Sequence, residues 1–274
     1  ERFAIKGLKA HSLEGESHRP HLENYEDYFR FCIDSIVVRE EGTLDRQQID
    51  LVVGKNFVIT IHRDRVDYFD EFRDREKGET RFGDLNAESF VATLLDLHIV
   101  TYYRALESIE HRVDRLDAKI LKTEIRTDQF LSAISDLRKD IAKLRRWLLP
   151  HRDIFYAFTR PDFQQIAESE SASHYELLNQ HFDSAVDAIE HSRETVLGSF
   201  DLYATKSAQM MNTFIQRLTF LTLVIGAMGV IAGVMGMNYK VDFFEAPNGF
   251  WLTVLGMGLI AVALTVFAKI KNWI

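Results

Sequence analysis

The stretch that decides the fold is LTFLTLVIGAMGVIAGVMGMNY, residues 218–239, which carries no charged side chain over 22 residues. A second stretch, FWLTVLGMGLIAVALTVFA, is free of charge from residue 250 to residue 268. A helix needs about 20 apolar residues to cross a hydrocarbon layer of about 30 Å, and both stretches meet that requirement. The alternative is a buried helical hairpin in a water-soluble protein. Two such runs joined by a short polar loop favour two membrane spans instead, and we expect no signal peptide at the start of the chain.

Charge divides the chain into two parts. The 274 residues have a formal net charge of −8, but the segment from Lys206 onward holds five basic and two acidic residues, while the first 205 hold 28 basic and 39 acidic ones. An acidic body argues against nucleic acid as a partner. One cysteine, Cys32, excludes an internal disulfide and a cysteine-based zinc finger. We read no catalytic constellation in the sequence and expect no enzyme activity.

The charges beside the spans predict their orientation. Arg217 precedes the first span, Lys269 and Lys271 follow the second, and Lys240 in the connecting loop is opposed by Asp242 and Glu245. The positive-inside rule then places both termini in the cytoplasm and the loop outside. We therefore expect a multi-pass protein of the cell's inner (plasma) membrane, with the acidic body in the cytoplasm, where a single unpaired cysteine is ordinary.

The body reads as strands followed by helices. Residues 31–38 predict a strand, and residues 48–53 and 57–62 predict a hairpin around a glycine turn. Helical spacing begins at about Ala87 and continues to Ile120, and a second helical run covers about 129–158, with Pro150 as a kink or a break. No proline occurs from His174 to Gly236, which predicts one helix on the order of 90 Å long. The fold class is an α/β cytoplasmic domain, with a mixed sheet and long helices, plus a stalk helix that runs into a transmembrane hairpin.

The expected organisation has six parts. They are a cytoplasmic α/β domain with a helical arm (1–173), a cytoplasmic stalk helix (174–217), a first transmembrane helix that lines the pore (218–236), an extracytoplasmic loop (237–249), a second transmembrane helix (250–268) and a basic cytoplasmic tail (269–274).

One face of the long helix is a candidate pore lining. Steps of three and four residues place the following side chains on that face: Asp201, Ala204, Ala208, Asn212, Ile215, Leu218, Thr222, Gly226, Gly229 and Gly233. Two helices cannot enclose an aqueous path, so conduction requires several copies around an axis. The usual meaning of such a charge run, with Glu194, Glu190 and Asp187 on or near the same stripe, is a solvated outer face of the helix. In a ring, however, carboxylates at the cytoplasmic end would concentrate cations.

The first span ends in Gly236-Met237-Asn238, ahead of a second C-terminal span. This arrangement resembles the CorA-type (two-span Gly-x-Asn) family of divalent metal ion transporters. Residues 51–60, LVVGKNFVIT, look like that family's cytoplasmic sheet, Leu94-Leu95-Asp96 and Leu106-Glu107 like its first helical arm, and residues 269–273 like its basic tail.

The resemblance implies a funnel-shaped homopentamer in membrane lipid. It implies that Gly236, Met237 and Asn238 form the outer selectivity filter, that Ile215 and Leu218 form an apolar constriction, and that Asn212 and Asp201 line the cytoplasmic vestibule. Asn238 and Asp201 would then meet a hydrated ion, since Mg²⁺ sheds water reluctantly. No resident cofactor is implied, and the transported Mg²⁺ or Zn²⁺ is the expected ligand.

The sequence also departs from the family pattern. The first span has no proline near its middle, and Lys240 lies where a cation would enter. The magnesium and zinc branches therefore both stay open, as do Co²⁺ and Ni²⁺. The hypothesis is a homo-oligomeric channel or transporter for divalent cations; the alternative is a non-conducting membrane scaffold or metal sensor with the same fold.

Overall fold

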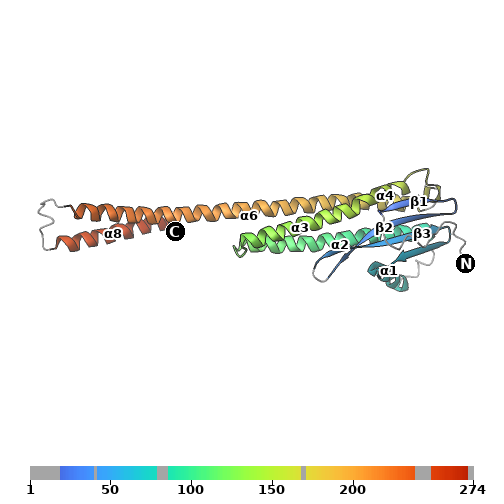
Figure 1. Ribbon diagram of the computed structural model, residues 1–274, viewed down its shortest axis with the longest axis horizontal. Helices are drawn as coiled ribbons and strands as arrows, with labels where there is room; N and C mark the ends of the chain where they lie inside the picture. The colour runs from blue at the N-terminus through green and yellow to red at the C-terminus, as the bar shows by residue number, and fades with distance from the viewer. Residues whose placement is uncertain (1–18, 40–41, 79–85, 168–170, 238–247, 271–274) are drawn as a thin grey trace. The chain divides into compact units, whose positions relative to one another are not determined.

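The computed structural model describes residues 19–39, 42–78, 86–167, 171–237 and 248–270 (Figure 1). The chain forms two compact units, Glu1–Phe200 and Asp201–Ile274. In order, the elements are β1 (His21–Asn24), β2 (Tyr28–Val38), β3 (Leu44–Gly54), β4 (Phe57–His62), α1 (Asp67–Gly78), α2 (Ala87–Leu121), α3 (Thr127–Leu148), the 3-10 turn η3 (Leu149–His151), α4 (Arg152–Phe158), α5 (Gln164–Ala167), α6 (Ala172–Met235) and α8 (Gly249–Ile270).

The four strands form one sheet in the order β1-β2-β3-β4, and every pairing in it is antiparallel. The prediction of a mixed sheet is wrong. Its reason is the length of the connections: β3 and β4 are joined by two residues only, and such a short link cannot return the chain for a parallel pairing. The predicted hairpin is confirmed, with Gly54 opposite Phe57. A Cβ on Gly54 would lie 2.4 Å from the Phe57 ring, so this glycine provides space.

Aromatic side chains fill the space between the sheet and the helices that follow it. Phe29 and Phe31 of β2 are fully buried, and both rings meet Phe158 of α4 edge-on, with centroids 5.8 and 5.4 Å apart. Phe163 closes the cluster against Phe29 at 5.2 Å. Edge-to-face aromatic pairs stabilise the fold by more than the burial of their apolar area alone, and they favour one arrangement of the rings.

Beyond the end of β1, side chains of other elements satisfy the backbone hydrogen bonds along the edge of β2. The register places His21 of β1 opposite Cys32, so among the described residues the backbone of β2 from Asp34 onward has no partner strand on that side. Side chains from other elements take its place: His151 Nε2 accepts from the Asp34 amide at 2.8 Å, and the Tyr102 hydroxyl donates to the Asp34 carbonyl at 2.7 Å. Thr101 Oγ1 accepts from the Ile36 amide at 3.3 Å. Buried backbone groups need such partners.

Two histidines lie wholly buried beside this edge, with ring centroids 5.1 Å apart. His151 Nδ1 donates to the Leu148 carbonyl at 3.0 Å, which leaves Nε2 as the acceptor for Asp34 and fixes the neutral ring. His98 Nδ1 shares a hydrogen bond with Ser35 Oγ at 3.0 Å. Burial lowers the pKa of His151 to about 4, and burial together with the neighbouring His151 holds the pKa of His98 well below its usual range.

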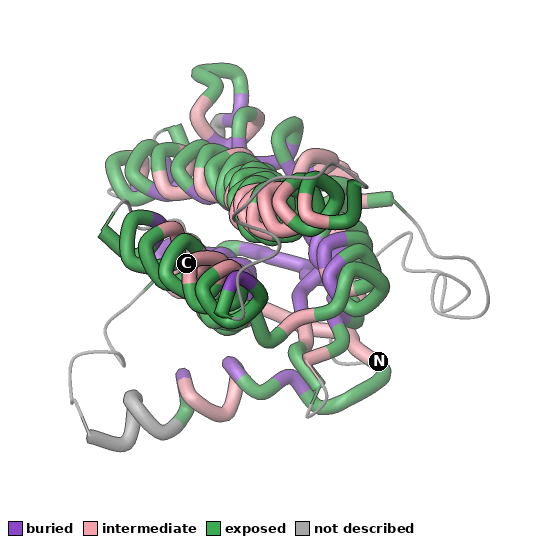
Figure 2. Tube along the Cα trace, turned by 90° about the vertical axis from the view of Figure 1, so that its left-hand side faces the viewer, coloured by how far each residue is buried: buried purple, intermediate pink, exposed green. Residues whose placement is uncertain are grey.

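Three helices of the first unit pack on one another through stripes at helical spacing. The buried positions are Ile109, Val113, Leu116 and Ile120 of α2, Phe130, Ile134, Leu137, Ile141 and Leu144 of α3, and Phe182, Ala185, Ile189, Ser192 and Val196 of α6. Figure 2 shows the exposed sides of these helices in green and the buried positions in purple. The predicted break at Pro150 is confirmed, since α3 ends at Leu148 and the proline lies in η3.

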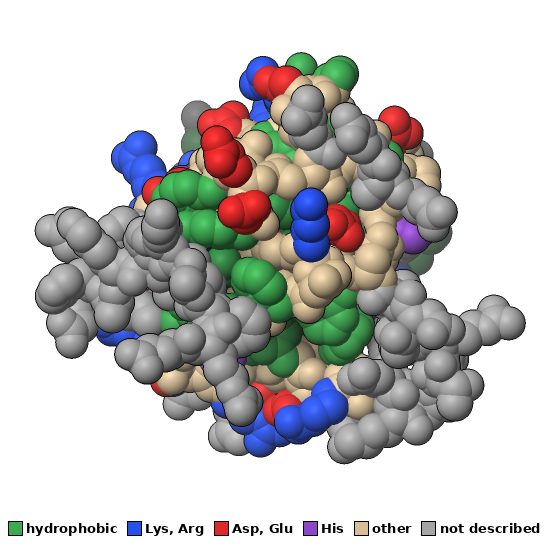
Figure 3. Space-filling model, turned by 90° about the vertical axis from the view of Figure 1, so that its right-hand side faces the viewer, with side chains coloured by type: hydrophobic (Ala, Val, Ile, Leu, Met, Phe, Trp, Pro, Cys, Tyr) green, Lys and Arg blue, Asp and Glu red, His purple; other side chains and the backbone are tan. Residues whose placement is uncertain are grey.

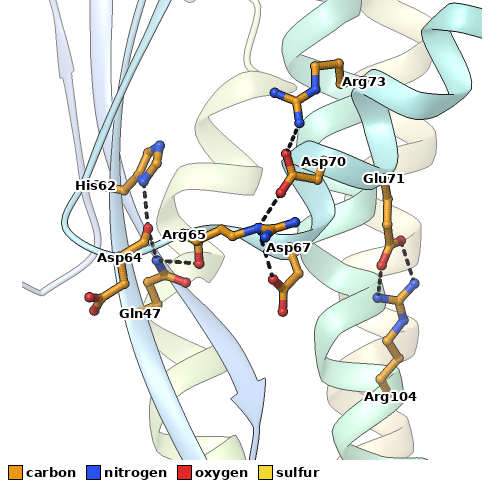
Figure 4. A network of polar contacts seen from close by, with 9 residues as sticks. All are labelled: Gln47, His62, Asp64, Arg65, Asp67, Asp70, Glu71, Arg73 and Arg104. Carbon is orange, nitrogen blue, oxygen red and sulfur yellow. Dashed lines mark hydrogen bonds and ion pairs between the residues drawn. The ribbon is translucent and has the colours of Figure 1, made fainter.

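A polar network fixes α1, a helix that the sequence reasoning missed (Figure 4). Arg104 of α2 donates two hydrogen bonds to the Glu71 carboxylate, each 2.7 Å long. Arg65 and Arg73 both pair with Asp70. The network crosses from the end of β4 to α2 and holds α1 in place. At the end of the molecule drawn in Figure 3, acidic and basic side chains lie interspersed among apolar ones in the described part of the chain.

Candidate ion-conduction path

The second unit consists of the C-terminal part of α6 and of α8, both of which have the length and composition of membrane spans. The most apolar window of each helix has no buried residue within the chain. The side chains of Phe250 and Trp251, for example, are 71% and 69% exposed. A helix in the core of a water-soluble protein would be covered by its own chain, so the buried-hairpin alternative does not fit. Helices with this much exposed apolar surface require lipid or further copies of the chain around them.

The two helices meet along one stripe of each. On α6 the half-buried positions of the span follow one side of the helix, at intervals of three or four residues with Met228 next to Ala227: Thr213, Gln216, Phe220, Val224, Ala227, Met228, Ile231 and Met235. On α8 the matching positions are Thr253, Gly256, Met257, Ala261, Leu264 and Ala268. Thr253 Oγ1 lies 3.7 Å from Met235 Sδ, which places the start of α8 beside the end of α6 (Figure 1).

The ten predicted pore-lining positions lie on the other side of α6, and all ten are exposed in the single chain: Asp201, Ala204, Ala208, Asn212, Ile215, Leu218, Thr222, Gly226, Gly229 and Gly233. At 3.6 residues per turn, this stripe lies roughly 150° around the helix from the one that contacts α8. The second span therefore leaves this face of α6 uncovered. Sequence reasoning did not identify the α8-facing stripe, although its small residues, Ala227, Gly256 and Ala261, are a usable signal.

The side chains of the uncovered face change in character along the helix. Ile215 and Leu218 are 51% and 50% exposed, and no described polar group lies between them on this stripe. The Thr222 hydroxyl donates to the Leu218 carbonyl at 2.9 Å, so its oxygen keeps free acceptor capacity. The side chains of Asn212 and Asp201 form no hydrogen bond or ion pair with any described residue. Their amide and carboxylate are free to meet water or a hydrated cation.

The glycines of this face are not explained by packing inside one chain. A Cβ added at Gly226, Gly229 or Gly233 would meet nothing within 4 Å. Small residues at a four-residue interval let helices approach closely, and within the described chain nothing makes that approach. The three glycines therefore leave space on this face of α6 in which another helix can approach closely.

The C-terminal end of α6 is described as far as Met237. The Gly236 amide donates to the Ala232 carbonyl at 2.9 Å and the Met237 amide to the Val234 carbonyl at 3.2 Å, so both residues continue the last turn of the helix. Gly236 does not take a left-handed backbone conformation, and its local geometry alone does not require glycine. Asn238, the third residue of the predicted filter and the one whose amide is expected to meet the ion, lies outside the described residues, and so does Lys240.

One of the three upstream carboxylates is engaged elsewhere. Glu190 pairs with Arg145 Nε of α3 at 2.6 Å, so it stabilises the packing of α3 on α6. Asp187 and Glu194 are exposed. Within the described ranges, no group of three or more His, Cys, Asp or Glu side chains is arranged to hold a metal ion.

Comparison with known proteins identifies the family. The model of the CorA-like Mg²⁺ transporter proteins matches residues 1–269. The chain belongs to the CorA family. A relative in that family, the cobalt/magnesium transport protein CorA of Thermotoga maritima, is 25% identical over 280 residues that cover 100% of this chain and 78% of the relative.

Two solved structures share the fold. The complete structure of the CorA magnesium transporter from Methanocaldococcus jannaschii matches with a TM-score of 0.67 and 22% identity, over 93% of this chain and 80% of that one. The full-length CmaX protein matches with a TM-score of 0.63 and 22% identity, over 94% and 79%. The predicted fold class, apart from its mixed sheet, is therefore confirmed, with an α/β domain, a long helix and a second C-terminal span.

Proposed function

We propose that this member of a family of divalent cation transporters conducts Mg²⁺, Zn²⁺, Co²⁺ or Ni²⁺ as a homopentamer with α6 around its axis. The observation that carries the proposal is the uncovered face of α6. It has free polar groups at Asn212 and Asp201, apolar side chains at Ile215 and Leu218, and glycines toward its outer end. Five copies of that face form a path that is wet at the cytoplasmic end and narrow and apolar in the middle.

In the proposed pore, ions are selected with their water shell. Asn238 amides and Gly236 carbonyls can hydrogen-bond the water around a divalent ion without removing it, which suits an ion that sheds water reluctantly. Apolar rings at Ile215 and Leu218 gate by excluding water. Asp201 carboxylates attract cations at the inner mouth. A divalent ion gains about 4.6 kcal/mol on entering across 100 mV, negative inside, so influx needs no ATP.

We also propose the orientation that the flanking charges predict. Both termini and the first unit lie in the cytoplasm, and the loop between the spans lies outside the inner membrane. Surface labelling of single cysteines placed in that loop and in the body of a Cys32→Ser protein tests this directly.

The test of function uses the purified protein in liposomes loaded with a dye that reports divalent cations. An inward gradient and a negative interior potential are imposed, and uptake of the four ions is compared. We expect uptake that Asn238→Ala changes in rate or ion preference. Asn248→Ala, the same substitution at an exposed asparagine before α8, is the matched control and should leave uptake unchanged. No uptake of any of the four ions, in protein shown to be inserted, refutes the proposal and favours a scaffold or sensor.

A further inference from the structure

A groove between α3 and α6 of the first unit has an unusual balance of charge. The cavity has a volume of about 220 Å³ and is lined by three arginines, Arg138, Arg145 and Arg193, and by one carboxylate, Glu190. The remaining lining is apolar, and Leu197 at its rim is 43% exposed. All of these residues belong to one compact unit.

Several other arginines of this unit are each matched by a carboxylate. Arg104 has both oxygens of Glu71. Arg112 contacts Asp140 at 2.6 Å, and Arg160 contacts Asp162 through two hydrogen bonds. Such matching is expected, because the first 205 residues hold more acidic than basic side chains.

The arginines of the groove are not matched one to one in this way. Arg145 Nε contacts Glu190 at 2.6 Å, and Arg193 reaches the other oxygen of the same carboxylate at 3.5 Å, outside the range of a short charge-assisted bond. Arg138 forms no ion pair with any residue of the described ranges. Two guanidinium groups therefore share the one carboxylate and the third has none, so the lining of this cavity carries two more positive than negative charges.

No carboxylate of α3 reduces this excess of positive charge in the groove. Arg138, Ala142 and Arg145 follow one another at intervals of four and three residues and so share a face, while Asp136 and Asp140 lie on other faces of the helix. Asp136 pairs with Lys139, and Asp140 pairs with Arg112 and Lys143. The nearest acidic side chains of α3 are thus turned away and already paired.

We propose that this groove binds a phosphate-bearing anion. Guanidinium groups present planar pairs of N–H donors that match two oxygens of a phosphate, and the half-exposed Arg145 and Arg193 side chains are accessible from solvent. The cavity is several times the roughly 30 Å³ that one water occupies, so it has room for more than a water or a chloride. Its apolar lining beside Leu197 favours a phosphate ester with an apolar or aromatic group over a bare anion.

The test is isothermal titration of the full-length protein in detergent with three probes: inorganic phosphate, ADP and dioctanoyl phosphatidic acid. These probes separate a free phosphate, a nucleotide and a lipid headgroup as the source of the anion. We expect ADP or the lipid to bind more tightly than phosphate. Arg138→Ala combined with Arg193→Ala should weaken that binding about ten-fold or more, since each change removes a charge-assisted contact. Arg146→Ala, an exposed arginine of α3 that does not line the groove, is the matched control.

A second variant separates ligand binding from structure. Glu190→Gln removes the one carboxylate that competes for Arg145 and Arg193, so it should tighten anion binding several-fold even though it removes an ion pair between α3 and α6. Thermal unfolding of each variant shows that it is folded. The proposal is overturned if no probe binds, if the double variant binds like the Arg146→Ala control, or if Glu190→Gln weakens binding in a folded protein.

Discussion

Acid should destabilise the first unit through its two buried histidines. In the folded chain His151 Nε2 accepts from the Asp34 amide and Nδ1 donates to Leu148, so a proton added at Nε2 would face a second donor. The pKa of His151 is about 4 in the folded chain, against about 6.5 for an unfolded histidine. Between these values the unfolded chain binds more protons, and the free energy of unfolding falls as pH falls.

The expected size follows from that difference. At pH 5 the unfolded ring is almost fully protonated and the buried ring almost fully neutral, which removes about 2 kcal/mol relative to pH 7 for His151. His98, whose burial and whose neighbour His151 also hold its pKa well below the usual range, acts in the same direction. Burial raises the pKa of Asp34, which opposes this trend at lower pH. For a unit of about 200 residues, the loss from His151 alone lowers Tm by roughly 4–8 °C.

The assay is thermal unfolding of the full chain in detergent at pH 7 and pH 5, followed by circular dichroism. His151→Gln keeps an oxygen that can accept from the Asp34 amide but cannot be protonated there, so the loss between the two pH values should shrink by about 2 kcal/mol. His111→Gln, at a side chain 71% exposed, is the matched control and should behave as the unaltered protein. Equal pH dependence in the two variants, or an imidazole of His151 that titrates near pH 6.5 by NMR, would refute the reasoning.

Three further outcomes are expected. Leu218→Asn should raise divalent uptake in liposomes by wetting the proposed constriction, whereas Leu223→Asn, on another side of α6, should not; equal effects contradict the assigned pore face. Gly229→Leu should reduce the oligomer seen by light scattering without unfolding the chain, because a Cβ there meets nothing within 4 Å; an unchanged oligomer argues against close approach at that glycine. Gly54→Ala should cost roughly 1–3 kcal/mol in chemical denaturation through its clash with the Phe57 ring, and a neutral result would show that the ring simply turns aside.

Sequence patterns predicted the elements whose signal is local. The hairpin of β3 and β4, the start of α2 at Ala87 and the break at Pro150 each follow from alternation, helical spacing or a residue that cannot continue a helix. The spans follow from the absence of charge. The ten-residue stripe on α6 follows from helical spacing, and the structure leaves that whole stripe uncovered.

The missed elements depend on contacts distant in sequence. The helix α1 has few apolar residues and many charges, and the burial of Tyr68 and Phe72 and the pair between Glu71 and Arg104 hold it in place. The strand β1 has four residues and no alternating pattern, and its form depends on pairing with β2. The mixed sheet was wrong because nothing in strand composition distinguishes antiparallel from parallel neighbours; connection length does. A pore is likewise a property of several chains, and one chain shows only the surface available for it.

The edge of β2, whose backbone groups are hydrogen-bonded by side chains from later in the chain, has a consequence for folding during synthesis. Its three caps come from residues 65, 68 and 117 positions away in the chain, all on the C-terminal side. At a synthesis rate of about 5–20 residues per second, the last of them leaves the ribosome roughly 6–23 s after the strand it protects. During that interval, none of the described residues already synthesised pairs with these amides and carbonyls, and a strand of another nascent chain can do so. Binding of chaperones to the nascent chain should therefore be greatest before residue 151 emerges, and it should decline once the His151 side chain bonds to the Asp34 amide.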